Sequence, residues 1–168
     1  QYDEVMAKYH QLVHGVDAAV GMIMEAVQRA GVAENTVIIF TSDNGYFCGS
    51  HGYGSKVLPY EEGSRVPLII VDPRHANSGK SIRCQEITGS IDFAPTILDL
   101  AGVRIPRNID GHSLLPLYDH PQKSIHESLQ LINVWGTAAC HSFAVLTKQH
   151  KYIYWPWEKD GLKPTEEI

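Results

Sequence analysis

Two hydrophobic patterns follow one another in the first quarter of the chain. Between residues 3 and 30 apolar side chains recur at steps of three and four, which predicts one amphipathic helix with a buried stripe. Asp17 falls on that stripe, so we expect a buried structural carboxylate there. Residues 36–41 form an unbroken β-branched and apolar run. Such a run is typical of a strand covered on both faces, as in a parallel sheet packed between helices.

The chain changes character after residue 102. A second strand is predicted at 66–71 and a short helix at 92–100, so residues 1–102 read as part of an α/β domain. Prolines and glycines over 103–125 predict a linker. Beyond it, a small antiparallel α+β subdomain is predicted over 126–168, with strands at 128–134, 142–147 and 151–155.

Composition narrows the classes of function. Hydrophobic residues make up 43% of the 168, which is enough for a packed core. The chain carries 14 Lys and Arg against 19 Asp and Glu, a net charge of −5. We therefore expect no nucleic-acid or membrane partner, since no basic cluster and no long apolar run is present.

Candidate chemistry follows the first predicted strand. That strand runs into Ser42, Asp43, Asn44 and Gly45, and a glycine-rich loop then leads to Lys56. Open α/β sheets place their sites at such strand ends. Carboxylate and amide oxygens suit Ca²⁺ and are poor ligands for zinc. Taken alone, however, Asp-Asn-Gly also reads as a simple turn, and Lys56 as a solvated loop lysine.

An ordered series of motifs makes the chain recognisable. Asp-Asn-Gly at 43–45, Gly-Ser-His-Gly at 49–52, Lys56 and Tyr-Glu-Glu-Gly-Ser-Arg-Val-Pro-Leu at 60–68 closely resemble the sulfatase family of the alkaline phosphatase-like superfamily. Ser-Ile-Asp-Phe-Ala-Pro-Thr at 90–96 extends the resemblance. It implies a partial alkaline phosphatase-like α/β layer, followed by the antiparallel appendage, and hydrolysis of aryl or sugar sulfates.

The resemblance also implies roles for single residues. Asp43 and Asn44 match calcium ligands, and Lys56 matches the lysine that contacts the sulfate group. His51 matches a histidine for which we expect either a catalytic role at the pocket edge or a role in structuring the loop. Ion pairs that brace this loop are expected from the three charged residues of the 60–68 motif, Glu61, Glu62 and Arg65.

The nucleophile of the family is not found in these residues. Sulfatases use a formylglycine made from a Cys/Ser-x-Pro/Ala-x-Arg motif, and none of Cys48, Cys84 and Cys140 has that context. We therefore expect a C-terminal portion of a longer sulfatase. Its missing N-terminal part would supply the nucleophile and the remaining calcium ligands. Alone, the 168 residues should be inactive and bind calcium weakly or not at all.

Two other functions stay open from the sequence. A phosphonate or phosphodiester hydrolase of the same superfamily would share the fold, and so would a non-catalytic binding or scaffold module. The resemblance alone points to a periplasmic, secreted or lysosomal protein that acts on a sulfated small molecule or glycan.

Overall fold

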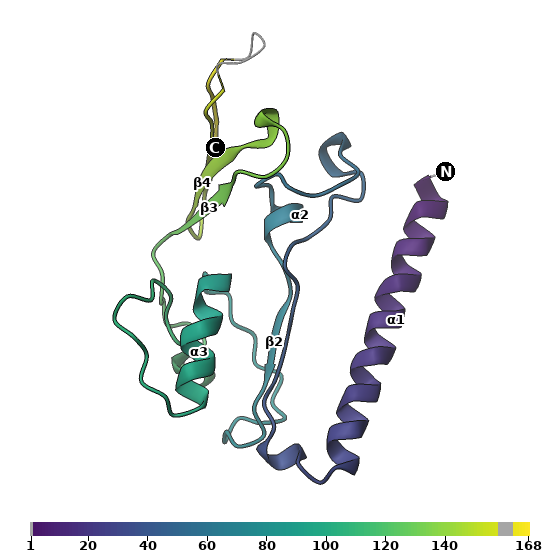
Figure 1. Ribbon diagram of the computed structural model, residues 1–168, viewed down its shortest axis with the longest axis vertical. Helices are drawn as coiled ribbons and strands as arrows, with labels where there is room; N and C mark the ends of the chain where they lie inside the picture. Colours follow the sequence, from purple (N-terminus) through teal and green to yellow (C-terminus); the bar gives the residue numbers. More distant parts are fainter. Residues whose placement is uncertain (1, 158–162) are drawn as a thin grey trace.

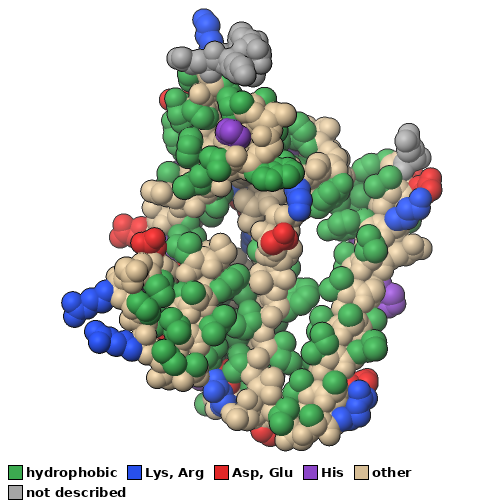
Figure 2. Space-filling view, in the orientation of Figure 1, with side chains coloured by type: hydrophobic (Ala, Val, Ile, Leu, Met, Phe, Trp, Pro, Cys, Tyr) green, Lys and Arg blue, Asp and Glu red, His purple; other side chains and the backbone are tan. Residues whose placement is uncertain are grey.

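A long N-terminal helix opens the computed structural model, which describes residues 2–157 and 163–168 (Figure 1). Helix α1 (Tyr2–Arg29) confirms the predicted helix. The carboxylates of Asp3 and Glu4 in its first turn interact favourably with the positive end of the helix dipole. The predicted buried stripe is wrong: no residue of α1 is buried, and Asp17 is exposed. Figure 2 shows apolar side chains along this helix and open space between its middle and the rest of the molecule. Periodicity shows which face a helix can bury, but it does not show whether a described element covers that face.

The first two strands form an antiparallel pair. Strand β1 (Ile38–Thr41) follows the one-turn helix η1 (Ala33–Asn35) and pairs with β2 (Leu68–Val71), from Ile38 opposite Val71 to Thr41 opposite Leu68. Both strands were predicted, but the parallel arrangement is wrong for this pair. An unbroken apolar run indicates burial and carries no information on strand direction, which the loop between the strands reverses here. The pair lies between α1 and α3 (Figure 1).

The middle of the chain is mostly irregular. Helix α3 (Phe93–Leu100) follows the short helix η3 (Ser90–Asp92) and confirms the helix predicted at 92–100. Residues 103–125 contain one further short helix, α4 (Pro116–Asp119). Within the described residues, no helix is both long and apolar enough to span a membrane.

The segment 103–125 is packed against α3 rather than loose. The Leu114 N–H donates to Oγ1 of Thr96 at 2.9 Å, and this hydroxyl in turn donates to the Asp92 carbonyl at 2.6 Å. Thr96 is 1% exposed and Leu114 is 2% exposed. A buried threonine with both hydrogen-bond functions used therefore fixes the segment at this point.

The C-terminal part is a four-stranded antiparallel sheet in the order β3-β4-β5-β6. Strands β3 (Leu129–Asn133), β4 (Ser142–Leu146) and β5 (Lys151–Trp155) confirm the three predicted strands. Strand β6 (Thr165–Glu167) was not predicted, because it is short and polar. The boundaries of the subdomain stay a prediction, and its residues 158–162 lie outside the described residues.

One hydrophobic core joins this sheet to the loop that follows β1. Ala144, Ile153 and Trp155 form the buried cluster, and Leu58 and Tyr60 pack against it. The remaining short elements are η2 (Ser50–Gly52) and α2 (Glu61–Ser64) in that loop, and η4 (Ala138–Cys140) between β3 and β4. The chain is thus a mixed helix and strand structure with antiparallel sheets.

Candidate functional site

Asp43 and Asn44 are held by local hydrogen bonds in a bend directly after β1. The Asn44 N–H donates to Oδ1 of Asp43 at 2.9 Å, and the hydroxyl of Ser42 donates to the Asn44 carbonyl at 2.8 Å. The Asn44 amide donates in turn to the Gly45 carbonyl at 2.8 Å. These bonds turn the amide oxygen of Asn44 away from the backbone, so it can accept from a neighbour or bind a cation.

Lys56 supplies that neighbour. Its ammonium donates to Oδ1 of Asn44 at 2.9 Å. Asp43, Asn44 and Lys56 line one open cleft of about 1080 Å³, here named the strand-end cleft. The lining also includes Glu86, a residue absent from the sequence-based candidates, and residues of the C-terminal sheet region, among them Trp135 and Lys148. Three of the four predicted site residues are therefore brought together.

The loop that carries Lys56 is folded on itself. The Phe47 N–H donates to the Ser55 carbonyl at 2.9 Å, and the Phe47 ring is 1% exposed. The Gly45 N–H donates to the Gly63 carbonyl at 2.9 Å, which closes the base of the loop. At Gly49 the backbone has φ +98°, a left-handed conformation that glycine adopts without strain.

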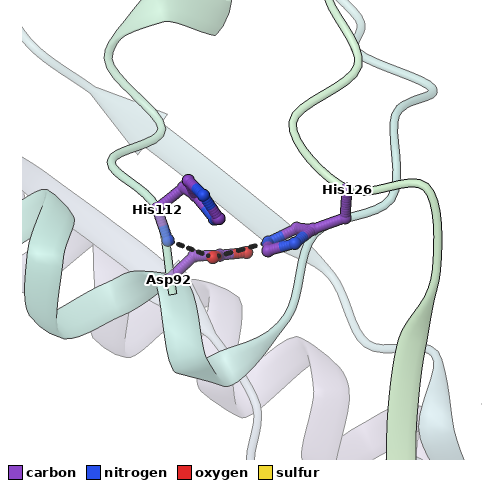
Figure 3. Close-up of side chains that lie close together, drawn as sticks. All are labelled: Asp92, His112 and His126. Atoms are coloured by element: carbon purple, nitrogen blue, oxygen red, sulfur yellow. Dashed lines mark hydrogen bonds and ion pairs between the residues drawn. The ribbon is translucent and has the colours of Figure 1, made fainter. Parts of the chain in front are cut away.

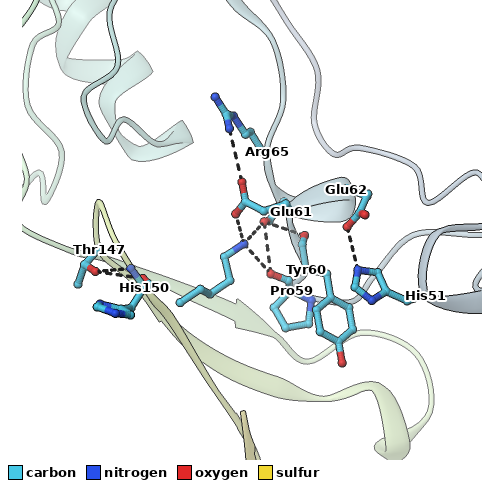
Figure 4. Close-up of polar contacts among 10 residues, drawn as sticks. His51, Pro59, Tyr60, Glu61, Glu62, Arg65, Thr147 and His150 are labelled. Carbon is cyan, nitrogen blue, oxygen red and sulfur yellow. Dashed lines mark hydrogen bonds and ion pairs between the residues drawn. The ribbon is translucent and has the colours of Figure 1, made fainter. Parts of the chain in front are cut away.

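His51 lies apart from the other three residues and does not line the strand-end cleft. Its Nε2 is 3.3 Å from a carboxylate oxygen of Glu62, and its ring stacks on Tyr60 with centroids 4.6 Å apart (Figure 4). These contacts match the loop-structuring alternative, and a catalytic role for His51 stays a prediction.

Lys151 is the centre of a polar network beneath the loop. Its ammonium donates to the Pro59 carbonyl at 2.9 Å and to Ser64 Oγ at 2.8 Å, and it pairs with Glu61 at 2.5 Å. Glu61 also faces Arg65 at 3.8 Å (Figure 4). Together with the Glu62–His51 contact, these pairs confirm the predicted ion-pair brace. Lys151 was not among the predicted site residues, and its partners lie about 90 residues earlier in the chain.

Two pKa values beside the loop are shifted. Burial, followed by a hydrogen bond to Glu167, raises the pKa of Tyr60 to about 12. The pKa of Glu62 is lowered, first by a hydrogen bond from its own backbone N–H, against an opposing effect of desolvation, and then by Ser50 and His51. At neutral pH Tyr60 therefore stays a neutral donor and Glu62 an anion.

Comparison with known proteins decides the family. The family profile described as Sulfatase matches residues 1–103. The chain belongs to the sulfatase family. It is 39% identical over 150 residues to N-acetylglucosamine-6-O-sulfatase of Bacteroides thetaiotaomicron, covering 89% of this chain and 25% of that protein. The resemblance seen in the sequence is confirmed.

Solved structures extend the comparison. One, a complex of a protein with its substrate D-glucosamine-2-N,6-O-disulfate, has a TM-score of 0.78 and 31% identity, covering 92% of this chain and 32% of that chain. The phosphonate monoester hydrolase of Silicibacter pomeroyi has a TM-score of 0.69 and 26% identity, covering 90% of this chain and 32% of that chain. The sulfatase chain described here thus spans about a quarter to a third of the length of the proteins it matches.

These matches confirm the predicted fold class, with neighbours of alkaline phosphatase-like fold. Relatives of the chain are named sulfatases, which are sulfuric ester hydrolases, and the family generally uses a metal ion.

Proposed function

We propose that the protein containing this chain hydrolyses sulfate esters, and that sulfated sugars are its substrates. The observation that carries the proposal is the cluster of Asp43, Asn44 and Lys56 in the strand-end cleft. Support for a sugar comes from the relative named N-acetylglucosamine-6-O-sulfatase and from the neighbour bound to a sulfated glucosamine. Aryl sulfates remain the other substrate class of this proposal.

Lys56 is suited to bind the sulfate group. The partner that the structure gives its ammonium is a neutral amide, so this contact does not neutralise the positive charge. An ammonium in that position attracts a sulfate oxygen and stabilises negative charge that develops as the ester bond breaks. We therefore assign to Lys56 the binding and stabilisation of the sulfate group.

Asp43 and Asn44 would hold a calcium ion. Their carboxylate and amide oxygens are hard donors and line the same cleft, so the donor set fits Ca²⁺. The ion, when bound, supplies positive charge that polarises the sulfate. Calcium takes six to eight oxygens, of which these side chains provide about two. The proposal therefore assigns the remaining ligands to other parts of the protein, and weak calcium binding to this chain alone.

The nucleophile is proposed to lie outside these 168 residues, because none of the three cysteines stands in a formylglycine motif. The short span relative to the matched proteins and the exposed apolar stripe of α1 support a chain that is part of a larger sulfatase. This stripe includes Val5, Leu12, Val13, Val16 and Ile23, all at least 49% exposed. Without a nucleophile, the chain alone should show no turnover.

The test compares Lys56→Ala with the matched surface variant Lys80→Ala in the full-length protein. Lys80 is exposed and bonds to Asn77, away from the strand-end cleft. Lys56→Ala should lower kcat/KM for glucosamine 6-sulfate and nitrophenyl sulfate by about 10²-fold or more, and Lys80→Ala should not. Equal activity of the two variants would remove Lys56 from the site.

Phosphonate or phosphodiester hydrolysis is the second candidate, favoured by the similarity to the phosphonate monoester hydrolase. The same full-length protein, assayed with nitrophenyl esters of sulfate, phosphate and phenylphosphonate, separates the two reactions by their kcat/KM values. Failure to hydrolyse any ester would favour the third possibility, a binding or scaffold module.

A further inference from the structure

A buried carboxylate outside the strand-end cleft joins three separate segments of the chain. Asp92 is 0% exposed and lies at the end of η3. Its Oδ2 accepts the Gly89 N–H at 2.8 Å, and its Oδ1 accepts the His112 N–H at 2.8 Å. Nε2 of His126 lies 2.8 Å from the same Oδ1.

The imidazole of His112 converges on the same point (Figure 3). One ligand atom from each of Asp92, His112 and His126 lies within 4.8 Å of the others. The two rings are edge to face, with centroids 4.9 Å apart and an interplanar angle of 79°. Among the described residues, this is the one group of three His, Cys, Asp or Glu side chains with such spacing.

We propose that Asp92, His112 and His126 bind a divalent transition-metal ion of the zinc class. One carboxylate oxygen and two imidazole nitrogens form a ligand set for tetrahedral Zn²⁺, with water in the fourth position. Calcium is a poor fit because imidazole is not a hard oxygen donor. The site is thus different in chemistry and in place from the one formed by Asp43 and Asn44.

The three ligand atoms, now within 4.8 Å of one another, must rearrange to accept the ion. Ligands at zinc distances of 2.0–2.1 Å stand about 3.3 Å apart in a tetrahedron. The Asp92–His126 separation of 2.8 Å must therefore lengthen by a few tenths of an ångström. A metal bond at Nε2 of His126 needs the lone pair of that nitrogen, so the ring binds as the tautomer with its proton on Nδ1 and gives up the contact with Asp92 Oδ1. His112 is exposed and can turn its ring without disturbing the core.

The surroundings already orient the carboxylate. Backbone N–H groups of Gly89 and His112 hold its two oxygens, and the His126 side chain is 8% exposed. Outer hydrogen bonds of this kind fix the direction of a metal ligand and raise affinity. An ion here would also add positive charge beside a fully buried anion. It would link residues up to 34 positions apart in the sequence.

The experiment titrates Zn²⁺ into the full-length protein by calorimetry, and Co²⁺ by visible absorption, which reports tetrahedral coordination. His112→Ala removes an exposed ligand and should leave the fold intact. His120→Ala removes another exposed histidine from the same segment and serves as the matched control. Neither measurement depends on sulfatase activity, so this inference and the proposed function can fail separately.

The expected result is micromolar Zn²⁺ binding with a tetrahedral Co²⁺ spectrum, an affinity loss of at least tenfold in His112→Ala, and none in His120→Ala. Asp92→Asn should lose zinc affinity as well, with circular dichroism as the check on folding. Affinity weaker than millimolar, or a loss below tenfold in His112→Ala, would overturn the proposal. Ca²⁺ binding that is tighter than Zn²⁺ binding and is weakened by His112→Ala would overturn it too.

Discussion

Lys56 and Asn44, twelve residues apart in the chain, meet at a hydrogen bond of 2.9 Å from the ammonium to the amide oxygen. The lysine proposed to bind sulfate therefore donates to the same Asn44 oxygen that is proposed to bind calcium. Because an amide is neutral, this contact positions the lysine without cancelling its charge. A carboxylate in the same place would position the lysine and also neutralise it.

Asn44→Asp tests this distinction in the full-length protein. The new carboxylate should pair with Lys56 and repel an anionic substrate, lowering kcat/KM for a sulfate ester by about tenfold or more. Asn108→Asp, an exposed asparagine in a turn, adds the same charge elsewhere and is the control. Steady-state kinetics that show equal losses in both variants would mean that only net charge matters.

Thr96→Val should destabilise the fold by about 1–3 kcal/mol. The substitution keeps the shape of the side chain but leaves the buried Leu114 N–H without its acceptor. Urea denaturation followed by circular dichroism measures the change. An unchanged midpoint would show that the contact between α3 and the segment 103–125 contributes nothing to stability.

Gly45→Ala should unfold the base of the Lys56 loop. A Cβ at Gly45 would overlap the backbone carbonyl of Glu62, and backbone cannot move aside as a side chain can. Gly54→Ala is the matched control, because its Cβ would meet nothing within 4 Å. Limited proteolysis should cut the Gly45→Ala loop faster than the Gly54→Ala loop. Equal cleavage rates would contradict the tight closure at this turn.

Tyr60 should make the chain sensitive to alkali. Its pKa is raised to about 12 in the folded state against about 10 in the unfolded chain, so ionisation favours unfolding. The stabilisation is complete below pH 10 and is lost as the pH rises from 10 to 12. Between pH 10 and 12 the free energy of unfolding of Tyr60→Phe should therefore fall by about 1–3 kcal/mol less than that of the unchanged chain.

Urea titrations at pH 8 and pH 11 measure this difference. Tyr118, whose pKa burial also raises to about 12, remains in the Tyr60→Phe variant, so the pH dependence should weaken and not vanish. Identical pH dependence in both proteins would show that Tyr60 is not the group responsible.

Local pattern predicted most elements of the fold but not their partners. The strands at 38–41, 68–71, 129–133, 142–146 and 151–155 appear where β-branched, aromatic and other apolar residues cluster, because strand preference is a property of nearby residues. The direction of the β1–β2 pair and the exposure of α1 depend on what lies across from them. That information is absent from periodicity.

The two candidate sites also differ in how far the sequence could predict them. Asp43, Asn44 and Lys56 lie within one short stretch, so a motif could mark them before their contacts were known. The Asp92 cluster draws its histidines from 20 and 34 residues away, with no spacing pattern to signal them. Only the fold brings those side chains together.

The position of Lys151 also bears on the order in which the chain can fold during synthesis. Its partly buried ammonium holds Pro59 and Ser64, which leave the ribosome 92 and 87 residues earlier. Until β5 has been made, the Lys56 loop lacks this anchor and the hydrophobic core on which Leu58 and Tyr60 pack. The loop that carries the proposed sulfate-binding lysine should therefore be among the last parts of the chain to acquire its native structure.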